Sequence, residues 1–281
     1  MCRIGLIGEN STEYINILLD IWNDGNCAVL IDWRIPPMAI IGMLKEANAE
    51  KCYIENKILI NFHNNIDNSG ITFIAFENQN APIMLVPAEI CNKYSNNYSK
   101  KEALILYSSG TTGRSKGIIL THFAIRTNVD AIIDYMGLNP TDRFFIIKTL
   151  SHSSTVVGEL LVALVHKLDI VVSKSIVSLK HMLDNIDKYA ATVLCVNPTL
   201  LKLLVFSEKN KMHQPYSLSA IWTSGSIAGK ELMEKAKSLF PNLQKICVSE
   251  PSCMATISTS NISQFSVLRG ACTFSRLNAV F

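Results

Sequence analysis

The stretch "ALILYSSGTTGRSKGIIL" (residues 103–120) places a flexible polar loop between two apolar segments. The loop, "SSGTTGRSKG" (108–117), carries three glycines, five hydroxyl side chains and two cations. Glycine permits positive φ angles, so successive backbone N–H groups in such a turn can point inward and form a concave anion site. Hydroxyl and ammonium groups add donors for a phosphate, here from Ser108, Ser109, Thr111, Thr112 and Lys116.

Two readings of this loop follow from its residues. The phosphate-binding reading does not rest on a Walker motif, because Ser115 stands before Lys116 where that motif requires glycine. The dinucleotide-binding pattern G-x-G-x-x-G is also missing from the loop. The alternative is a Ser/Gly linker between two lobes. Phosphate binding is favoured because the segment is short and closely flanked by segments with strand and helix patterns.

Strand and helix patterns alternate on both sides of the loop. Residues 4–55 read as strand–helix–strand–helix–strand, and a second alternating series runs from 143 to 249. This order predicts an α/β fold: two stacked α/β lobes with mainly parallel sheets and flanking helices. We expect the first lobe to cover residues 1–120, ending in the phosphate-binding loop, and the second to cover 121–281.

Composition and local patterns argue against a nucleic-acid-binding, membrane-spanning or secreted protein. The 281 residues are 48% hydrophobic and 17% charged with a net charge of +3, so charge suggests no nucleic-acid partner. The apolar segment 156–172 contains four ionisable residues and predicts a buried helix running into a strand, with no membrane span. The N-terminus lacks a signal-peptide pattern, and the eight cysteines are scattered, so we expect a cytoplasmic protein with reduced thiols.

The loop and its flanks resemble a known family. "YSSGTTGRSKGIILTH" (107–122) is similar to the signature of the adenylate-forming (AMP-binding) superfamily, which includes acyl-CoA synthetases, peptide-synthetase adenylation domains and luciferases. It departs once, with Ser115 where proline is usual. Weaker resemblances follow in family order: "VNPTLLKLL" (196–204), "WTSGSIAGKEL" (222–232) and "ICVSEPSCMATIS" (246–258). The resemblance implies the layered αβαβα N-terminal domain of these enzymes, incomplete and without their C-terminal domain.

The resemblance also implies an activity. Family members let a substrate carboxylate attack the α-phosphate of ATP, which gives an acyl-adenylate, and the acyl group then passes to a thiol. We therefore expect an AMP-forming acid–thiol ligase that uses ATP and Mg²⁺ on a small carboxylic acid, fatty or otherwise organic. The expected thiol is coenzyme A or a pantetheine carrier. Attack at phosphorus depends on positioning and charge neutralisation, which explains a loop made of donors.

Roles for individual residues come from the same resemblance. The β- and γ-phosphates would be held by the loop, in particular by Ser108, Ser109, Gly110, Thr111, Thr112, Gly113 and Lys116. Ser249 would donate to the α-phosphate, and Glu250 would hold Mg²⁺. His152 would separate the nucleotide pocket from the acyl pocket. The adenine side and the floor of the acyl pocket would be lined by Ser224, Gly225 and Ser226. Outside this family, His152 reads as an ordinary surface histidine and Glu250 as a strand-end carboxylate.

Two departures keep a second hypothesis open. Ile246 and Cys247 stand where the family carries an adenine-stacking tyrosine and a glycine, so a π-face is lost and a Cβ is added. The chain also ends before the family's ribose-binding aspartate and its C-terminal domain with the catalytic lysine. It is therefore expected to be a fragment of a ligase, one part of a split ligase completed by a separate chain, or a catalytically inactive nucleotide- or acyl-binding remnant. The acyl substrate cannot be read from these residues.

Overall fold

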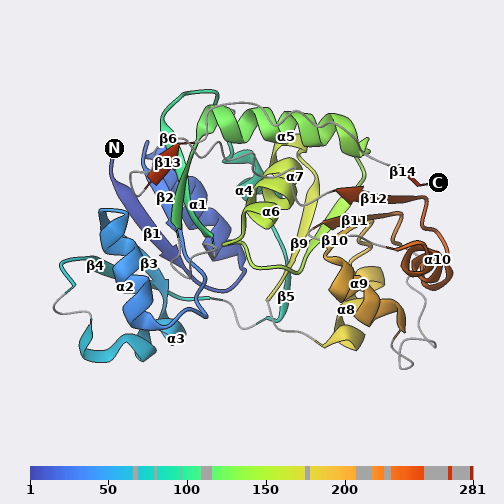
Figure 1. The fold of residues 1–281 in the computed structure, drawn as a ribbon, viewed down its shortest axis with the longest axis horizontal. Coiled ribbons are helices and arrows are strands. Elements are labelled where there is room, and N and C mark those ends of the chain that lie inside the picture. The colour runs from blue at the N-terminus through green and yellow to red at the C-terminus, as the bar shows by residue number, and fades with distance from the viewer. Residues whose placement is uncertain are drawn as a thin grey trace.

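The computed structural model describes residues 1–65, 69–78, 81–95, 97–108, 116–174, 178–206, 217–224, 229–249, 265–267 and 279–280. Within them the chain forms two seven-stranded sheets side by side (Figure 1). The first sheet has the order β13-β7-β6-β2-β1-β3-β4 and the second the order β14-β12-β11-β10-β8-β9-β5.

The first sheet is parallel except where β6 meets β7. Its strands are β1 (Arg3–Ile7), β2 (Cys27–Leu30), β3 (Ala49–Glu55), β4 (Thr72–Phe76), β6 (Glu102–Ser108), β7 (Lys116–Thr121) and β13 (Phe265–Val267). The helices that accompany it are α1 (Thr12–Asn23), α2 (Pro37–Glu46), α3 (Asn56–Leu59) and the 3₁₀ turn η1 (Ile60–Asn65).

The second sheet is parallel through its centre, and its edge strands β5 and β14 run antiparallel to their neighbours. Its strands are β5 (Ile83–Leu85), β8 (Arg143–Ile146), β9 (Asp169–Ser173), β10 (Val193–Val196), β11 (Ala220–Ser224), β12 (Lys245–Ser249) and β14 (Ala279–Val280). The helices around it are α4 (Ala88–Asn92), α5 (His122–Met136), α6 (Ser153–Thr155), α7 (Leu161–His166), α8 (Leu179–Lys188), α9 (Pro198–Phe206) and α10 (Lys230–Leu239).

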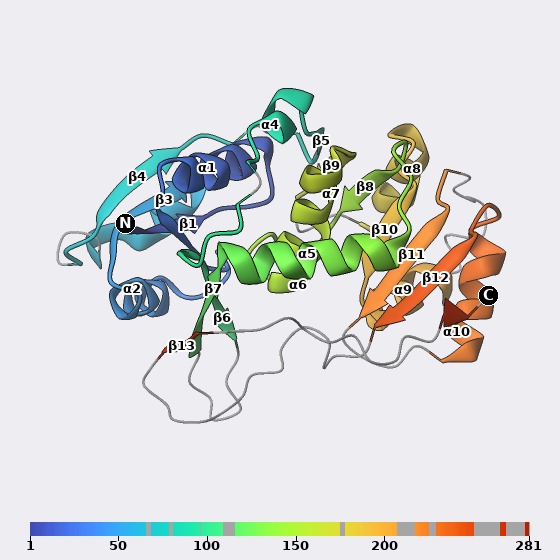
Figure 2. The ribbon, with the colours of Figure 1, turned by 90° about the horizontal axis from the view of Figure 1, so that it is seen from above.

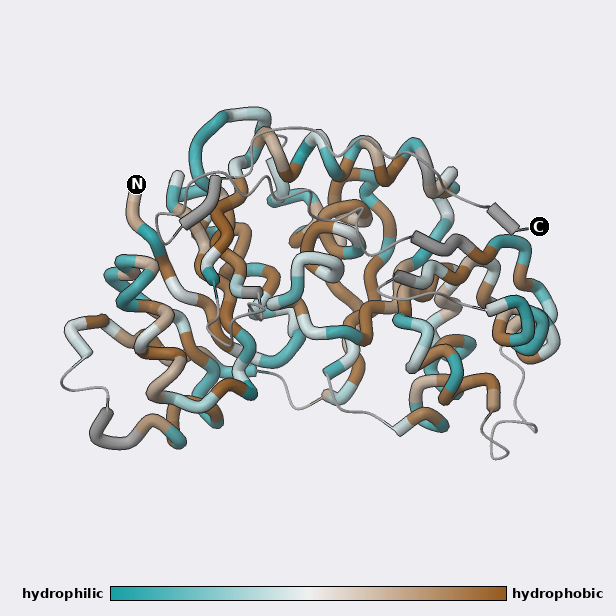
Figure 3. The backbone as a smooth tube through the Cα atoms, viewed as in Figure 1, coloured by the Kyte–Doolittle hydropathy of each residue, from teal (hydrophilic) through white to brown (hydrophobic). Residues whose placement is uncertain are grey.

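Three hydrophobic clusters divide the molecule into five layers. The outer cluster of the first sheet packs α2 against one face, and the outer cluster of the second sheet packs α8, α9 and α10. The central cluster joins the inner faces of both sheets with α1, α5 and α7 between them. Figure 3 shows the same distribution, with apolar residues concentrated on the strands and on α7. The predicted αβαβα layering is confirmed.

Helix α5 runs from the first sheet to the second (Figure 2). It begins at Thr121, whose side chain accepts a hydrogen bond from the backbone N–H of Ala124, and it ends at Gly137 in the left-handed conformation (φ 54°). Seen from above, it runs from β7 beside the first sheet to the second sheet (Figure 2). Buried side chains of α5, Val129 and Ile132 among them, belong to the central cluster that both sheets share.

Three features of the fold differ from the simplest sequence prediction. Strand β5, which precedes the loop, pairs with β9 and so joins the second sheet, whereas β13 pairs with β7 in the first. The single helix expected from residue 156 contains a π-helical turn, η2 (Val156–Leu160), between α6 and α7. The division into lobes near residue 120 remains a prediction. Within the part of the chain that the structure describes, no helix combines the length and apolarity needed to cross a bilayer.

Candidate functional site

The polar loop closes a β-hairpin. Ser108, the last residue of β6, is the register partner of Lys116, the first residue of β7, and Tyr107 is the partner of Gly117. The paired strands hold the two ends of the loop next to each other, as a cradle requires and a flexible linker does not. Lys116 is exposed at the start of β7. The remaining predicted loop residues lie outside the described residues: Ser109, Gly110, Thr111, Thr112 and Gly113.

The loop of the hairpin begins at the carboxyl edge of the first sheet. Strand β6 runs parallel to β2, and β2 runs parallel to β1, so the residues that follow each of these strands share one edge. Besides Ser108, that edge carries Asn10 after β1 and Asp32 after β2. Open α/β sheets bind their ligands at this edge, in the crevice beyond the strand ends.

The remaining predicted site residues occupy the carboxyl edge of the second sheet. Ser224 ends β11 and is the register partner of Ser249, which ends the parallel neighbour β12. His152 follows β8 by six residues on the same edge. Gly225, Ser226 and Glu250 lie outside the described residues, directly beyond the ends of β11 and β12.

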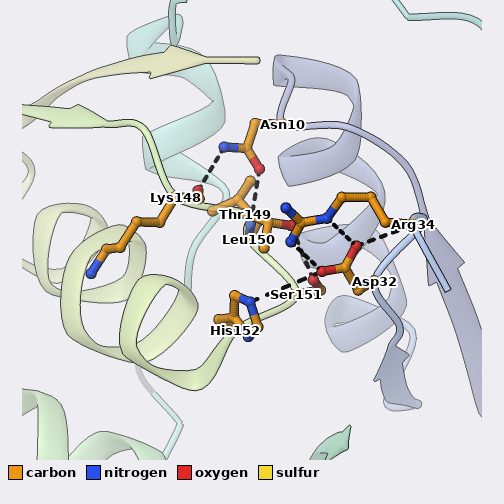
Figure 4. Close-up of polar contacts among 8 residues, drawn as sticks. All are labelled: Asn10, Asp32, Arg34, Lys148, Thr149, Leu150, Ser151 and His152. Carbon is orange, nitrogen blue, oxygen red and sulfur yellow. Dashed lines mark hydrogen bonds and ion pairs between the residues drawn. The ribbon is translucent and has the colours of Figure 1, made fainter. Parts of the chain in front are cut away.

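Asn10 joins the two carboxyl edges. Its side-chain amide is buried and donates to the backbone carbonyls of Lys148 (2.7 Å) and Ser173 (3.0 Å), while its Oδ1 accepts from the backbone N–H of Leu150 (2.8 Å). Figure 4 shows this amide reaching from the start of α1 to the segment that leads to His152. The two edges therefore face each other where β1 ends opposite the ends of β8 and β9, and we refer to this contact region as the junction.

His152 lies at this junction opposite Asp32. Its Nε2 is 4.0 Å from the Asp32 carboxylate, and more than half of the imidazole is exposed. Partial desolvation lowers the pKa of His152, and the positive charges of Arg34 and Lys148 act in the same direction, against the opposing effect of Asp32. The imidazole is thereby biased toward its neutral form.

A tight turn after β2 holds Asp32. Arg34 donates from its backbone N–H (3.0 Å) and its Nε (2.9 Å) to Oδ1, and from Nη2 to Oδ2 (2.5 Å). Partial burial acts to raise the pKa of Asp32, but the hydrogen bonds from Arg34 outweigh it and lower the pKa. Asp32 is therefore an anion with a fixed orientation, and both of its carboxylate oxygens accept hydrogen bonds from the Arg34 guanidinium.

A buried ion pair lies beneath the His152 segment. Lys148 Nζ is 2.8 Å from Glu159 Oε1, and the Glu159 side chain is almost completely inaccessible. Burial raises the pKa of Glu159 to about 7, although Lys148 opposes that rise. Glu159 belongs to the π-helical turn η2, a conformation that is frequent at functional sites.

Sequence reasoning missed four polar residues of this junction. Asn10 precedes Ser11, which caps α1 by accepting from the backbone N–H of Tyr14, and nothing in the local pattern separates the two residues. Asp32 and Arg34 lie just beyond β2, and position at a carboxyl edge was the signal that could have identified them. Lys148, the fourth, follows β8 in the same way. No group of three or more acidic, histidine or cysteine side chains suited to a metal occurs among the described residues.

The structure describes the side chain of Ile246, one of the two residues that depart from the family pattern. Ile246 of β12 is buried at 2% exposure in the outer cluster of the second sheet. Its side chain therefore belongs to the hydrophobic core. The side chain of Cys247 lies outside what the structure describes.

Comparison with known proteins identifies a consistent set of relatives. The model of the family described as AMP-binding enzyme matches residues 2–261. The 4-coumarate–CoA ligase-like 9 protein of Arabidopsis thaliana is 32% identical over 152 residues, which are 50% of this chain and 25% of that protein. The malonate–CoA ligase ACSF3 of Xenopus laevis is 25% identical over 164 residues, which are 57% of this chain and 28% of that protein.

A solved structure agrees with the layers described above. The N-terminal domain of FACL13 from Mycobacterium tuberculosis superposes with a TM-score of 0.73 at 14% identity, over 88% of this chain and 62% of that one. At this identity the likeness concerns the fold alone. The matched part of the chain spans between a quarter and a third of the two curated ligases.

Proposed function

Because the chain belongs to the AMP-binding enzyme family, we propose that it activates a small carboxylic acid by adenylation with ATP. The acyl-adenylate and pyrophosphate are the products of this step. A thiol, either coenzyme A or a pantetheine arm, takes the acyl group in a second step. The two related CoA ligases support the use of coenzyme A, whereas the acid is left open as a fatty or other organic acid.

The proposed chemistry brings two anions together. A carboxylate must approach the α-phosphate of a polyanion, so donors that neutralise charge and hold both groups in line carry most of the rate. The hairpin loop from Ser108 to Lys116 holds the β- and γ-phosphates in this proposal, and Ser249 donates to the α-phosphate. His152 stands between nucleotide and acid in this proposal.

Mg²⁺ has one proposed ligand in this chain. Glu250 directly follows β12 at the carboxyl edge, and carboxylate and phosphate oxygens are the ligands that this hard cation prefers. When bound, Mg²⁺ supplies charge neutralisation to the phosphate oxygens. The 224–226 turn, with Ser224, Gly225 and Ser226, borders the adenine and the acyl group.

One observation carries the proposal: the junction of the two carboxyl edges. Ser108 and Lys116 stand at strand ends of the first sheet, and Ser224 and Ser249 end neighbouring strands on the carboxyl edge of the second, which also carries His152. The three hydrogen bonds of Asn10 join those edges. In this proposal, residues at the strand ends of both sheets bind the substrates from two sides, which suits a reaction between two separately bound substrates.

The proposal is tested by acid-dependent ATP–pyrophosphate exchange. We expect exchange with at least one acid of a panel covering short, long-chain, aromatic and dicarboxylic acids, when a C-terminal domain from a family member is supplied in trans. The Lys116→Ala variant should lose most of the exchange, whereas Lys230→Ala, on an exposed residue of α10, should keep it. Exchange at background for the entire panel, with ATP bound normally, would rule out adenylation by this chain.

The buried position of Ile246 favours a second candidate function. An aliphatic side chain in the core offers no aromatic face to a nucleotide base, a contact of about 0.5–1.5 kcal/mol between aromatic rings. A catalytically inactive nucleotide- or acyl-binding protein is consistent with that loss. This candidate predicts ATP binding without exchange, so the same two measurements separate it from the ligase.

A further inference from the structure

The turn between β2 and α2 presents a preformed anion to the second sheet. Arg34 binds both oxygens of Asp32 through its guanidinium, and the backbone N–H of Ile35 donates to the Asp32 carbonyl (3.1 Å). A carboxylate bound through both of its oxygens has one orientation, and in this orientation Oδ2 is the atom nearest His152. Figure 4 shows the Asp32 carboxylate between the Arg34 guanidinium and the His152 imidazole.

The backbone of the opposing segment is equally fixed. The N–H of His152 donates to the carbonyl of Thr149 (3.2 Å), and the carbonyl of His152 accepts from the N–H of Val156 (2.9 Å). Asn10 binds the same segment at Leu150. Only the side-chain torsions of His152 remain free, and the imidazole is its exposed part.

The charged groups that face the imidazole come from both sheets. Asp32 and Arg34 lie on the first sheet, and Lys148 lies on the second. At 4.0 Å the imidazole is about 1 Å beyond hydrogen-bonding distance of Asp32, so a small rotation of the ring closes the contact. Apo sites commonly show such long contacts, which shorten when substrate binds.

We propose that Asp32, oriented by Arg34, is a positioning residue that holds the His152 imidazole at the junction of the two sheets. The first sheet thereby sets where the imidazole stands between the two substrates, although the second sheet carries it. This role rests on the proposed function, because it matters for adenylation only if His152 separates nucleotide from acid. The contact itself exists without any substrate, so it can be tested in the chain alone.

The test is a pH titration of the His152 imidazole by NMR. The chain, labelled with ¹³C-histidine, contains six histidines, and His152→Gln identifies the resonance of interest. Asp32→Asn removes the anion and should lower the His152 pKa, whereas Arg34→Gln removes a cation and should raise it. A shift of about 0.5–1 pKa unit in each direction is expected for a unit charge at this distance near a protein surface.

A matched control and a functional measurement complete the test. Asp134→Asn changes an exposed carboxylate on α5 and should leave the His152 pKa unchanged. An unchanged pKa in both junction variants, or shifts in the same direction, would overturn the proposal. Normal titration shifts without any ATP–pyrophosphate exchange would refute only the proposed function. If exchange is found, Asp32→Asn should lower kcat and move its pH profile, whereas Asp134→Asn should change neither.

Discussion

Replacing Lys148 with methionine perturbs the buried ion pair beneath the His152 segment. In the native chain, burial raises the pKa of Glu159 from 4.5 to about 7 even with Lys148 Nζ at 2.8 Å. Each pKa unit corresponds to about 1.4 kcal/mol, so the difference of about 2.5 units represents on the order of 3 kcal/mol. Because the folded state binds this proton more tightly, the associated stability is present below pH 4.5 and is lost as the pH rises to 7.

The methionine variant should continue to lose stability above that pH. Without the cation the pKa of Glu159 rises further, so the folded chain keeps the proton that the unfolded chain releases. The free energy of unfolding of the variant then falls by about 1.4 kcal/mol for each pH unit above 7. In the native chain, Glu159 makes no further contribution to the pH dependence of stability in this range. Between pH 7 and pH 8.5 the two curves should diverge by about 2 kcal/mol.

Urea unfolding at several pH values, followed by far-UV circular dichroism, measures this divergence. The Lys148→Met/Glu159→Gln double variant is the control, because it has no carboxylate to titrate and should not diverge further above pH 7. Parallel curves for Lys148→Met and the native chain from pH 7 to pH 8.5 would refute the reasoning. They would mean that the Lys148 ammonium does not stabilise the buried carboxylate.

Three further predictions concern the core and the contact between the sheets. Asn10→Ala removes three hydrogen bonds and should lower the free energy of unfolding, measured with urea, by about 3 kcal/mol. A decrease below about 1 kcal/mol would contradict the role assigned to this amide. Gly5→Ala should lower the free energy of unfolding by about 1–3 kcal/mol, because the added Cβ would lie 2.6 Å from a Leu44 methyl group. Gly42→Ala, which adds a Cβ in open space on α2, should not lower it, and equal losses in the two variants would refute the argument. Burial raises the pKa of the Cys52 thiol, so iodoacetamide should modify Cys52 only on unfolding, and native-state labelling detected by mass spectrometry would contradict this.

Local patterns predicted most of the strands and helices. The helical spacing of Ile15, Leu18 and Leu19 in α1 survives as a buried face, and glycine and hydroxyl residues mark the loop after β6. The π-helical turn at Glu159 was not predicted, because a single extra residue in a helix leaves no distinct hydrophobic period.

The site was predictable only in part. The family signature identified candidate residues from the sequence around each of them. That Ser224 lies beside Ser249 follows from the register of the neighbouring strands β11 and β12. Asp32 and His152 are separated by 120 positions, and their contact depends on how the two sheets stack. Pairing across such a distance follows from tertiary packing, which no local pattern of residues encodes.

The proposed phosphate cradle is tested most directly by isothermal titration of ATP·Mg²⁺ into the chain and its Lys116→Ala variant. We expect saturable binding to the native chain and an affinity at least about tenfold lower in the variant, because a charge-assisted hydrogen bond contributes roughly 1.5–3 kcal/mol. Lys230→Ala, which removes another exposed lysine, should bind as the native chain does. Identical isotherms for all three proteins, or no binding to any, would contradict a nucleotide site at the β6–β7 hairpin.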